Sequence, residues 1–512
     1  MMQNWTDGYL ADIDYTYGYN GEMNPQRLAL AFAQAGVVMP NVGTACELGF
    51  GQGLSTNIHA AASTVSWYGT DFNPAQASFA RELAQSAGHQ AQLFDQSFKE
   101  FCSRDDLPEF DFIALHGIWS WVSAENRTIL VDFFRRKLKV GGVLYISYNT
   151  LPGWSAFAPI RQLMTEHALS MGSSGAGVVE RINGALDFVD RVFSVDPLHL
   201  RVNPTANDRL TIVKNQNRHY LAHEYFNADW HPMYFSELAQ LLNSAKLDFA
   251  SSANLLDLVD AINLSEPQQK LLSSIPDLQL RQTVRDFVVN QQFRRDYWVK
   301  GLRRLSGLEQ LEAFRSLKLV LTTRREDVKL QSATALGRIN LHEPIYAPVL
   351  DVLADNRPHG FEEIEQKVAS RGVTTAQLRD AVVVLAGIGA LEVAGKDADH
   401  PHTRKACAGL NARLFDKARS SSEINFVASP VIAGGIALAR FHQMFVQSLQ
   451  RGHKKPEEWA QETWRVLAAQ GQTLVKDGKS LASADENLAE LTEMAKSFAE
   501  KLLPVLKALQ IA

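Results

Sequence analysis

The chain has 512 residues, of which 46% are hydrophobic and 21% are charged; both values lie near the averages for globular proteins and exclude a disordered or fibrous chain. At roughly 150 residues per domain, this length predicts about three domains. The formal net charge of -5 argues against a protein that chiefly neutralises nucleic-acid phosphates, so we expect a small molecule or a protein as partner and no nucleic acid.

Cysteine usage and the N-terminal sequence bear on the compartment. Cys46, Cys102 and Cys407 are scattered and cannot form several disulfides or a four-thiolate metal site, which fits a reducing environment. Residues 1–25 lack the basic start and apolar core of a signal peptide, and no stretch approaches the roughly 20 apolar residues that span a bilayer. We therefore expect a cytoplasmic protein with no membrane partner and no metal.

Helix and strand patterns alternate over the first 150 residues. The periodicity predicts helices at 25–35, 54–62, 74–87 and 124–138, and strands at 44–49, 66–70, 90–94, 110–115 and 142–148. Alternation of this kind predicts a parallel sheet covered by helices on both faces, which is an α/β, Rossmann-like fold.

Strand signals thin out beyond Pro152. Residues 155–330 show mainly helical periodicity, with a polar, partly extended piece at 203–220. Helices predicted at 361–370 and 374–387, followed by the apolar run 390–394, are typical of a winged-helix unit. Residues 459–512 are predicted to be helical, with an apolar stripe at three- and four-residue steps: Leu488, Leu491, Met494, Phe498, Leu502 and Val505.

The first strand runs into a glycine-rich turn, Glu47-Leu-Gly-Phe-Gly-Gln-Gly53. Ligands of an open parallel sheet bind beyond the carboxyl ends of its strands, so this turn is the first place to look for a cofactor. Gly49, Gly51 and Gly53 permit positive φ and let the backbone pass close to a ligand. A dinucleotide fingerprint would place glycine or alanine at Leu54, and a P-loop would need Gly-Lys-Ser/Thr, which is absent.

The charge around the turn favours a cationic ligand over a phosphate. No Lys or Arg occurs between residues 41 and 80, while Glu47 and Asp71 stand at the ends of the first two predicted strands. A ligand that carries a sulfonium, an ammonium and a ribose diol would gain from these carboxylates. Asp71 can accept two hydrogen bonds from ribose hydroxyls, a role that NAD enzymes share. Asp95-Gln96 follow the third strand and suit an adenine edge.

At this point residues 41–150 resemble the class I S-adenosylmethionine-dependent methyltransferases. The resemblance lies in the E-L-G-F-G-Q-G turn, the Y-G-T-D strand, the F-D-Q step and the K-V-G-G-V-L-Y-I-S strand. It implies a seven-stranded sheet, S-adenosyl-L-methionine as cofactor, and the methionine portion over Gly49, Gly51 and Gly53. Asp71 would bind the ribose and Asp95 would lie near adenine. The cofactor-binding candidates are Glu47, Gly49, Gly51, Gly53, Asp71, Phe72, Asp95, Gln96 and His116.

A narrower resemblance concerns methyltransferases with a regulatory domain after the catalytic one, a group that includes bacterial protein-lysine methyltransferases. Its motifs are Tyr15-Thr-Tyr-Gly-Tyr19, His116-Gly-Ile-Trp-Ser-Trp-Val122, Tyr148-Asn-Thr-Leu-Pro-Gly-Trp154 and Tyr220-Leu-Ala-His-Glu-Tyr225. We expect a catalytic domain at 1–165, a mainly helical regulatory or dimerisation domain at 166–335, a winged-helix-like module at 336–400 and a helical domain at 401–512. The later domains could also join two copies in a homodimer.

Four residues are catalytic candidates: His116, Trp119, Tyr148 and Tyr17. Aromatic faces attract a cationic donor or a lysine acceptor, and Trp119, Tyr148 and Trp154 lie near two predicted strand ends. Tyr17 could close the pocket, and His116 could take a proton from the acceptor. Each aromatic residue is about as well explained by packing.

Alternative functions stay open at this stage. The methyl acceptor could be a protein lysine, a saccharide or a small molecule, and the later domains could instead make the chain a binding scaffold with a methyltransferase-like fold. His223-Glu-Tyr-Phe-Asn227 resembles a zinc-protease motif, but Asn227 replaces its second histidine, so a polar network between domains is preferred. Residues 351–400 hold nine acids against five Lys and Arg, which disfavours DNA binding by the winged-helix-like region.

Overall fold

The structure is a computed structural model, and it describes residues 16–88, 91–172 and 177–512. Tyr15, the first tyrosine of the N-terminal motif, lies outside the described residues. None of the helices in these three ranges is long and apolar enough to cross a membrane.

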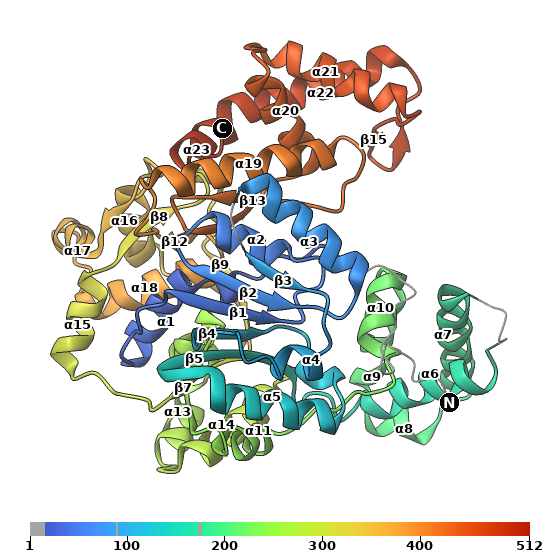
Figure 1. Cartoon of the computed structure of the whole chain (residues 1–512), viewed down its shortest axis with the longest axis vertical. Coiled ribbons are helices and arrows are strands. Elements are labelled where there is room, and N and C mark those ends of the chain that lie inside the picture. The colour runs from blue at the N-terminus through green and yellow to red at the C-terminus, as the bar shows by residue number, and fades with distance from the viewer. Residues whose placement is uncertain (1–15, 89–90, 173–176) are drawn as a thin grey trace.

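A seven-stranded sheet forms the centre of the molecule (Figure 1), in the order β3-β2-β1-β4-β5-β7-β6. The first five strands are parallel to their neighbours, whereas β7 runs antiparallel to both β5 and β6. This confirms the predicted Rossmann-like sheet. Its strands are β1 (Thr44–Leu48), β2 (Ser66–Thr70), β3 (Gln92–Phe94), β4 (Phe110–Leu115), β5 (Leu138–Asn149), β6 (Leu247–Ser252) and β7 (Phe293–Lys300).

Helices cover both faces of the sheet because alternate strand residues point to opposite sides. Ala45, Phe112 and Tyr145 pack with α1 in one core, whereas Cys46 and Ile113 pack with α5 and α11 in another. In Figure 1, α2 and α3 lie on one side of the sheet and α5 and α11 on the other. The helices next to the sheet are α1 (Pro25–Ala35), α2 (Leu54–Ala61), α3 (Pro74–Ala87), α4 (Phe98–Cys102), α5 (Ala124–Lys137), α11 (Phe235–Asn243) and α14 (Leu278–Val289).

The last two strands come from a part of the chain that the sequence predicted to be helical. β6 and β7 lie within 247–300, so the sheet extends well past the domain boundary expected at residue 165. β7 is hard to find in the sequence because Arg294 and Asp296 interrupt its apolar pattern. In the fold both side chains are buried as ion pairs: Arg294 contacts Asp286 at 2.6 Å and Asp296 at 2.8 Å.

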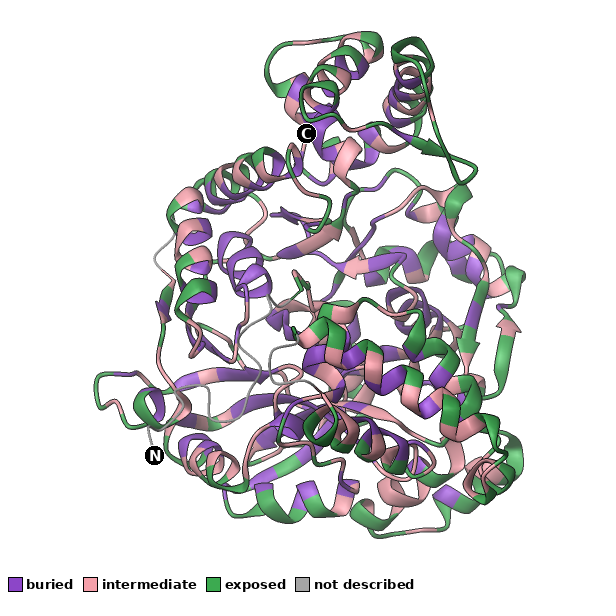
Figure 2. Cartoon of the chain, turned by 90° about the vertical axis from the view of Figure 1, so that its right-hand side faces the viewer, coloured by how far each residue is buried: buried purple, intermediate pink, exposed green. Residues whose placement is uncertain are grey.

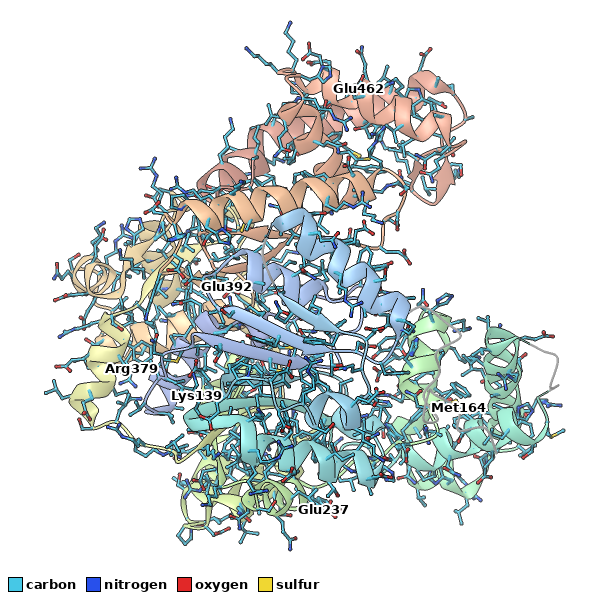
Figure 3. All side chains as sticks on the ribbon, in the orientation of Figure 1. Lys139, Met164, Glu237, Arg379, Glu392 and Glu462 are labelled. Carbon is cyan, nitrogen blue, oxygen red and sulfur yellow. The ribbon has the colours of Figure 1, made fainter. Side chains whose placement is uncertain are left out.

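Five helices form a small unit with its own core beside the carboxyl edge of the sheet, and Met164, labelled in Figure 3, belongs to this core. The expected extended piece at 203–220 is wrong, because Leu210 and Val213 pack into this core as helical residues. The Asn217 side chain also caps the next helix by accepting from the backbone N–H of His219. The helices are α6 (Ala158–Ser170), α7 (Val178–Ser194), α8 (Leu198–Val202), α9 (Thr205–Lys214) and α10 (Arg218–Tyr225).

A module of helices and short strands follows β7. α17 (Phe361–Ala369), α18 (Thr375–Gly387) and β12 (Leu391–Val393) match the elements expected there, while the winged-helix assignment itself stays a prediction. The ion pair between Arg27 of α1 and Glu392, which is labelled in Figure 3, joins β12 to the region around the seven-stranded sheet. The other elements of this module are α15 (Gly307–Arg315), β8 (Lys318–Leu321), β9 (Gln331–Thr334), β10 (Gly337–Asn340), α16 (Glu343–Val352) and β11 (His359–Gly360). Between β6 and β7 the chain forms η3 (Leu255–Leu258), α12 (Asp260–Asn263) and α13 (Glu266–Ser273) before α14.

The C-terminal region packs on the helices beside the sheet through α19 (Pro401–Ala418), which lies against α2 and α3. Burial is concentrated around the sheet and between these helices, as Figure 2 shows. Leu491, Phe498 and Val505 of the predicted apolar stripe are buried in the core that α19 shares with α2 and α3. The remaining elements are β13 (Phe426–Ser429), β14 (Gly434–Ala437), α20 (Arg440–Gln450), α21 (Pro456–Ala469), β15 (Val475–Lys476), β16 (Lys479–Ser480), α22 (Ala484–Ser497) and α23 (Leu503–Ala508).

Candidate active site

The glycine-rich turn connects β1 to α2 and needs glycine for two physical reasons. Gly49, Gly51 and Gly53 have φ values of 77°, 56° and 68°, a region that side chains disfavour. A Cβ on Gly49 would lie 2.5 Å from Cδ1 of Ile118, and a Cβ on Gly53 would lie 2.5 Å from Cβ of Ala80. Gly49 and Gly53 therefore leave no room for a side chain, and the turn packs closely against Ile118 and Ala80 at the carboxyl end of β1.

Two buried carboxylates flank this turn. The Thr56 hydroxyl donates to Glu47, and burial raises the pKa of Glu47 to about 7. Asp71, at the end of β2, accepts from the backbone N–H of Gly51 at 2.8 Å and of Asn73 at 3.0 Å. Burial raises its pKa to about 6. Carboxylates desolvated in this way favour a ligand that brings positive charge or hydroxyl donors.

The residues after β2 and β3 lie at the same edge of the sheet. Phe72 follows Asp71 and is half-buried, whereas Asp95 is exposed and pairs with Arg81 at 2.6 Å, which lowers its pKa. The carbonyl of Gln96 accepts from the Thr70 hydroxyl at 2.5 Å, so the backbone at this step is held against β2. The Gln96 side-chain carbonyl accepts from the Arg104 guanidinium at 3.4 Å, and contact of Asp95 and Gln96 with an adenine edge stays a prediction.

His116 follows β4 and contacts aromatic side chains on two sides. Its Nδ1 lies 2.7 Å from the Tyr145 hydroxyl, with the two rings parallel, and the Phe293 ring stands edge-on at 6.1 Å. Burial lowers the pKa of His116 to about 4, so its imidazole is neutral at pH 7. Glu22 and Arg295 form an ion pair near this ring and have opposite effects on its pKa: Glu22 raises the pKa of His116 and Arg295 lowers it.

Trp119 and Tyr148 are core residues, which corrects the expectation that they line a pocket. Both side chains are fully buried in the core on the α5 and α11 side of the sheet. The Trp119 indole donates to Sδ of Met233 at 3.3 Å, and the Tyr148 hydroxyl donates to Asp296 at 3.0 Å. In sequence, an aromatic residue at a strand end looks the same whether it packs inward or faces a ligand.

Trp154 is also packed, with the Arg209 guanidinium 4.4 Å above its ring. Tyr17 is half-buried, and its ring meets Phe79 of α3 edge-on at 5.3 Å. Tyr19 accepts at its hydroxyl from the backbone N–H of Gly435 at 2.8 Å. The N-terminal segment therefore lies between the catalytic domain and the C-terminal region, and closure of the pocket by Tyr17 stays a prediction.

The sequence missed four residues that surround His116: Glu22, Tyr145, Phe293 and Arg295. Tyr145 could have been found, because it lies on the strand whose neighbours Tyr148 and Trp154 were singled out. Glu22 and Arg295 are 273 positions apart, and the sequence carries no signal that brings them together.

The motif from His223 to Asn227, which resembles that of zinc proteases, lies at the C-terminal end of α10. The Asn227 amide donates to the His223 carbonyl at 2.5 Å, and the Arg161 guanidinium donates to the Asn227 carbonyl at 2.6 Å, so these residues join α6 to α10. In the described ranges no group of three or more His, Cys, Asp or Glu is placed to hold a metal ion.

Two known protein families match parts of this chain. Residues 46–146 match a methyltransferase domain, and residues 217–300 match a predicted methyltransferase regulatory domain. An uncharacterized protein of Synechocystis sp. is 39% identical over 513 residues, which covers 99% of this chain and 100% of that protein. An uncharacterized protein of Rickettsia prowazekii is 27% identical over 53% of this chain and 49% of its own length.

Solved structures show the same fold over nearly the whole chain. PKMT2 from Rickettsia typhi in complex with AdoHcy has a TM-score of 0.68 at 18% identity, and covers 97% of this chain and 100% of that one. A second structure of PKMT2 from Rickettsia typhi has a TM-score of 0.70 at 16% identity, with the same coverage. The likeness therefore extends past the catalytic sheet to the later regions.

Proposed function

Because this chain belongs to the S-adenosylmethionine-dependent methyltransferases that carry a methyltransferase regulatory domain, we propose that it methylates lysine side chains of a protein acceptor. S-adenosylmethionine supplies a methyl carbon bonded to a positively charged sulfur. The observation that carries the cofactor site is the tight turn of three positive-φ glycines between two buried carboxylates.

The residues of the turn fit this cofactor. Positive φ at the three glycines and close packing against Ile118 and Ala80 fix the backbone of the turn at the carboxyl end of β1, where ligands of parallel sheets bind. We assign Gly49, Gly51 and Gly53 to the methionine portion and Asp71 to the ribose hydroxyls. Glu47 would favour the positive charge, while Asp95 and Gln96 would face adenine beside Phe72.

The acceptor must reach the site as a neutral amine, since the ammonium form has no lone pair. The amine nitrogen forms its bond to the methyl carbon as the carbon–sulfur bond breaks, and the electron pair of that bond stays on sulfur. The extra proton on nitrogen then leaves to solvent. Burial of the lysine side chain between aromatic rings favours its neutral form by lowering its pKa.

His116 is better suited to orient the amine than to store its proton. With a pKa of about 4, its imidazole would return a proton to water at neutral pH. A neutral ring can still accept a hydrogen bond from the amine N–H. The Tyr145 hydroxyl fixes the ring through Nδ1, which leaves Nε2 as the nitrogen available to the acceptor.

Two further features favour a protein lysine over a saccharide or a small molecule. The four motifs quoted from the sequence resemble bacterial protein-lysine methyltransferases, and the fold is shared with PKMT2 along 97% of the chain. The matched methyltransferase domain takes only residues 46–146, and so large a remaining share suits a macromolecular acceptor.

Methyl-tritiated S-adenosylmethionine added to the enzyme and a cell extract tests this function. We expect label in protein, recovered as methyl-lysine after acid hydrolysis. Label in saccharide or small-molecule fractions would overturn the lysine assignment. Label in no fraction, with donor binding intact, would instead favour the non-catalytic scaffold.

A further inference from the structure

Two adjoining cavities lie beside β6 and β7, the two strands within the matched regulatory-domain range 217–300. The first cavity has a volume of about 340 Å³ and the second a volume of about 360 Å³. They share Asp257, Arg285 and Gln291 as wall residues, so together they form one groove. Each volume alone lies within the range of small-ligand sites.

One wall residue of the first cavity also contacts the candidate active site. Phe293 lines the cavity, and the same ring stands edge-on to His116 at 6.1 Å. Phe293 pairs with Asn149, the last residue of β5, so this end of the groove lies at the carboxyl edge of the sheet. A side chain that leaves the groove past Phe293 therefore arrives at the imidazole of His116.

The wall of this cavity carries amide groups. Asn254, Asn290, Gln291 and Gln292 line it, and amide side chains both donate to and accept from a peptide backbone. Asn290 is exposed at the end of α14. Apolar substrates would gain little from such a lining, whereas a main chain would.

The opposite wall is the hairpin of β9 and β10. Ala333, Thr334 and Ala335 of this hairpin line the cavity, and the two alanines leave space beside the strand. β9 pairs with β10 alone among the described strands, so one of its edges has main-chain groups free for another strand. An extended peptide can add to such an edge through main-chain hydrogen bonds.

The second cavity has excess positive charge. Arg281, Arg285 and Arg304 line it and donate mainly to backbone carbonyl groups, those of Ile275, Asp257 and Ala35 respectively. Asp257 and Asp296 also line this wall; Arg294 pairs with both Asp296 and Asp286, and Arg285 lies 3.7 Å from Asp260. Arg281 and Arg304, which donate to main-chain carbonyls, are therefore the groups that would receive an acidic side chain.

We propose that this groove receives the extended peptide segment that carries the acceptor lysine, with the segment lying along β9, its lysine passing Phe293 and an acidic side chain among the arginines. The proposal rests on the lysine-methylating function proposed above. It adds a specificity site that involves the hairpin and the edge of the sheet outside the cofactor-binding half.

Three blocked probes test the groove: a single acetylated lysine amide, a seven-residue alanine peptide with a central lysine, and the same peptide with glutamates on both sides of the lysine. For the wild-type enzyme we expect kcat/KM to rise by about tenfold from the single lysine to the alanine peptide. A further rise of about threefold is expected for the glutamate peptide at low salt.

Bulky substitutions in the hairpin provide the discriminating variants. Ala333→Trp, and independently Ala335→Trp, should fill the groove and return the peptides to the kcat/KM of the single lysine, with donor-induced thermal stabilisation unchanged. Leu336→Trp is the matched control, because Leu336 is an exposed residue of the same hairpin outside the groove wall, and it should keep the gain with length.

The outcomes separate the two proposals. Equal kcat/KM for all three probes, or a gain with length that survives in both alanine variants, would overturn the groove while leaving lysine methylation intact. No methylation of any probe, the single lysine included, would count against the lysine-methylating function itself.

Discussion

Burial of Glu47 beside the glycine turn destabilises the charged form of its carboxyl group. Its carboxyl pKa of about 7 in the fold lies above the ordinary value of 4.5, because burial disfavours the charged form. The folded chain thus holds this proton more tightly than the unfolded chain does. Above pH 7 the ionised Glu47 destabilises the fold, and this cost shrinks as the pH falls toward 4.5.

Glu47→Gln should therefore stabilise the protein without donor and weaken its response to the donor. At pH 8 we expect a gain on the order of 3 kcal/mol at most in the free energy of unfolding, which should fade toward pH 5. Melting curves at both pH values check the sign. Glu125→Gln, at an exposed glutamate in α5, should change stability by no more than about 0.5 kcal/mol. A gain that is equal at both pH values would contradict the burial argument.

The glycines of the turn allow a second comparison at the same scale. Gly53→Ala places a Cβ at positive φ and 2.5 Å from Ala80, so we expect loss of donor binding and a cost above about 2 kcal/mol. Gly88→Ala is matched for backbone, with φ 66°, but no atom lies within 4 Å of the added Cβ. It should cost about 1 kcal/mol and keep donor binding, as isothermal titration would show. Equal effects of the two variants would mean that the close approach at Gly53 is unimportant.

The site residues that belong to a local motif could be predicted from the sequence. The site residues that come together from distant segments of the chain could not. The turn and Asp71 were found because positive φ and strand-end carboxylates leave a local signature in the sequence. Trp119 and Tyr148 were misplaced because strand-end aromatics carry no sign of which face they take. Glu22 and Arg295 form their pair only when the N-terminal segment meets β7.

At the scale of elements, β7 is where the sequence and the fold differ most. The parallel strands β1, β2 and β4 are short segments between turn signals and helical patterns, and they were predicted to within a residue at each end. Arg294 of β7 is buried between Asp286 and Asp296, and the charged residues in its sequence prevented the prediction of a central strand. The helical pieces α9 and α10 were missed for a related reason, since polar caps and short turns weakened their periodicity.

Arg294→Met should destabilise the protein strongly, by about 3–5 kcal/mol, because it leaves Asp286 and Asp296 buried without their partner. Chemical denaturation measures this loss. Arg135→Met removes an exposed i,i+3 pair with Asp132 and should cost less than about 0.5 kcal/mol. If both variants lost the same small amount, the ion pairs of β7 would not be what holds the strand in the sheet.

At the scale of the whole molecule, the catalytic sheet is surrounded by the later regions instead of standing apart from them. α19 packs on α2 and α3, where the Arg413 side chain pairs with Glu82 and the Cys407 thiol donates to the Ala61 carbonyl. α2 begins directly after Gly53, so the C-terminal region braces the helix that follows the cofactor turn. Sequence periodicity predicted these later helices, but not that they would cover the catalytic half.

Donor-induced stabilisation of wild-type protein and Asp71→Ala tests the central claim most directly, because a ligand that binds only the folded state raises the melting temperature by mass action. We expect a clear rise with millimolar S-adenosylmethionine or its demethylated product for the wild type, and little or none for Asp71→Ala. Asp106→Ala, at an exposed acid of the same domain, should respond like the wild type, and NADH should give no shift. A wild-type protein that showed no shift with either S-adenosyl ligand, or an Asp71→Ala variant that shifted in full, would contradict the account.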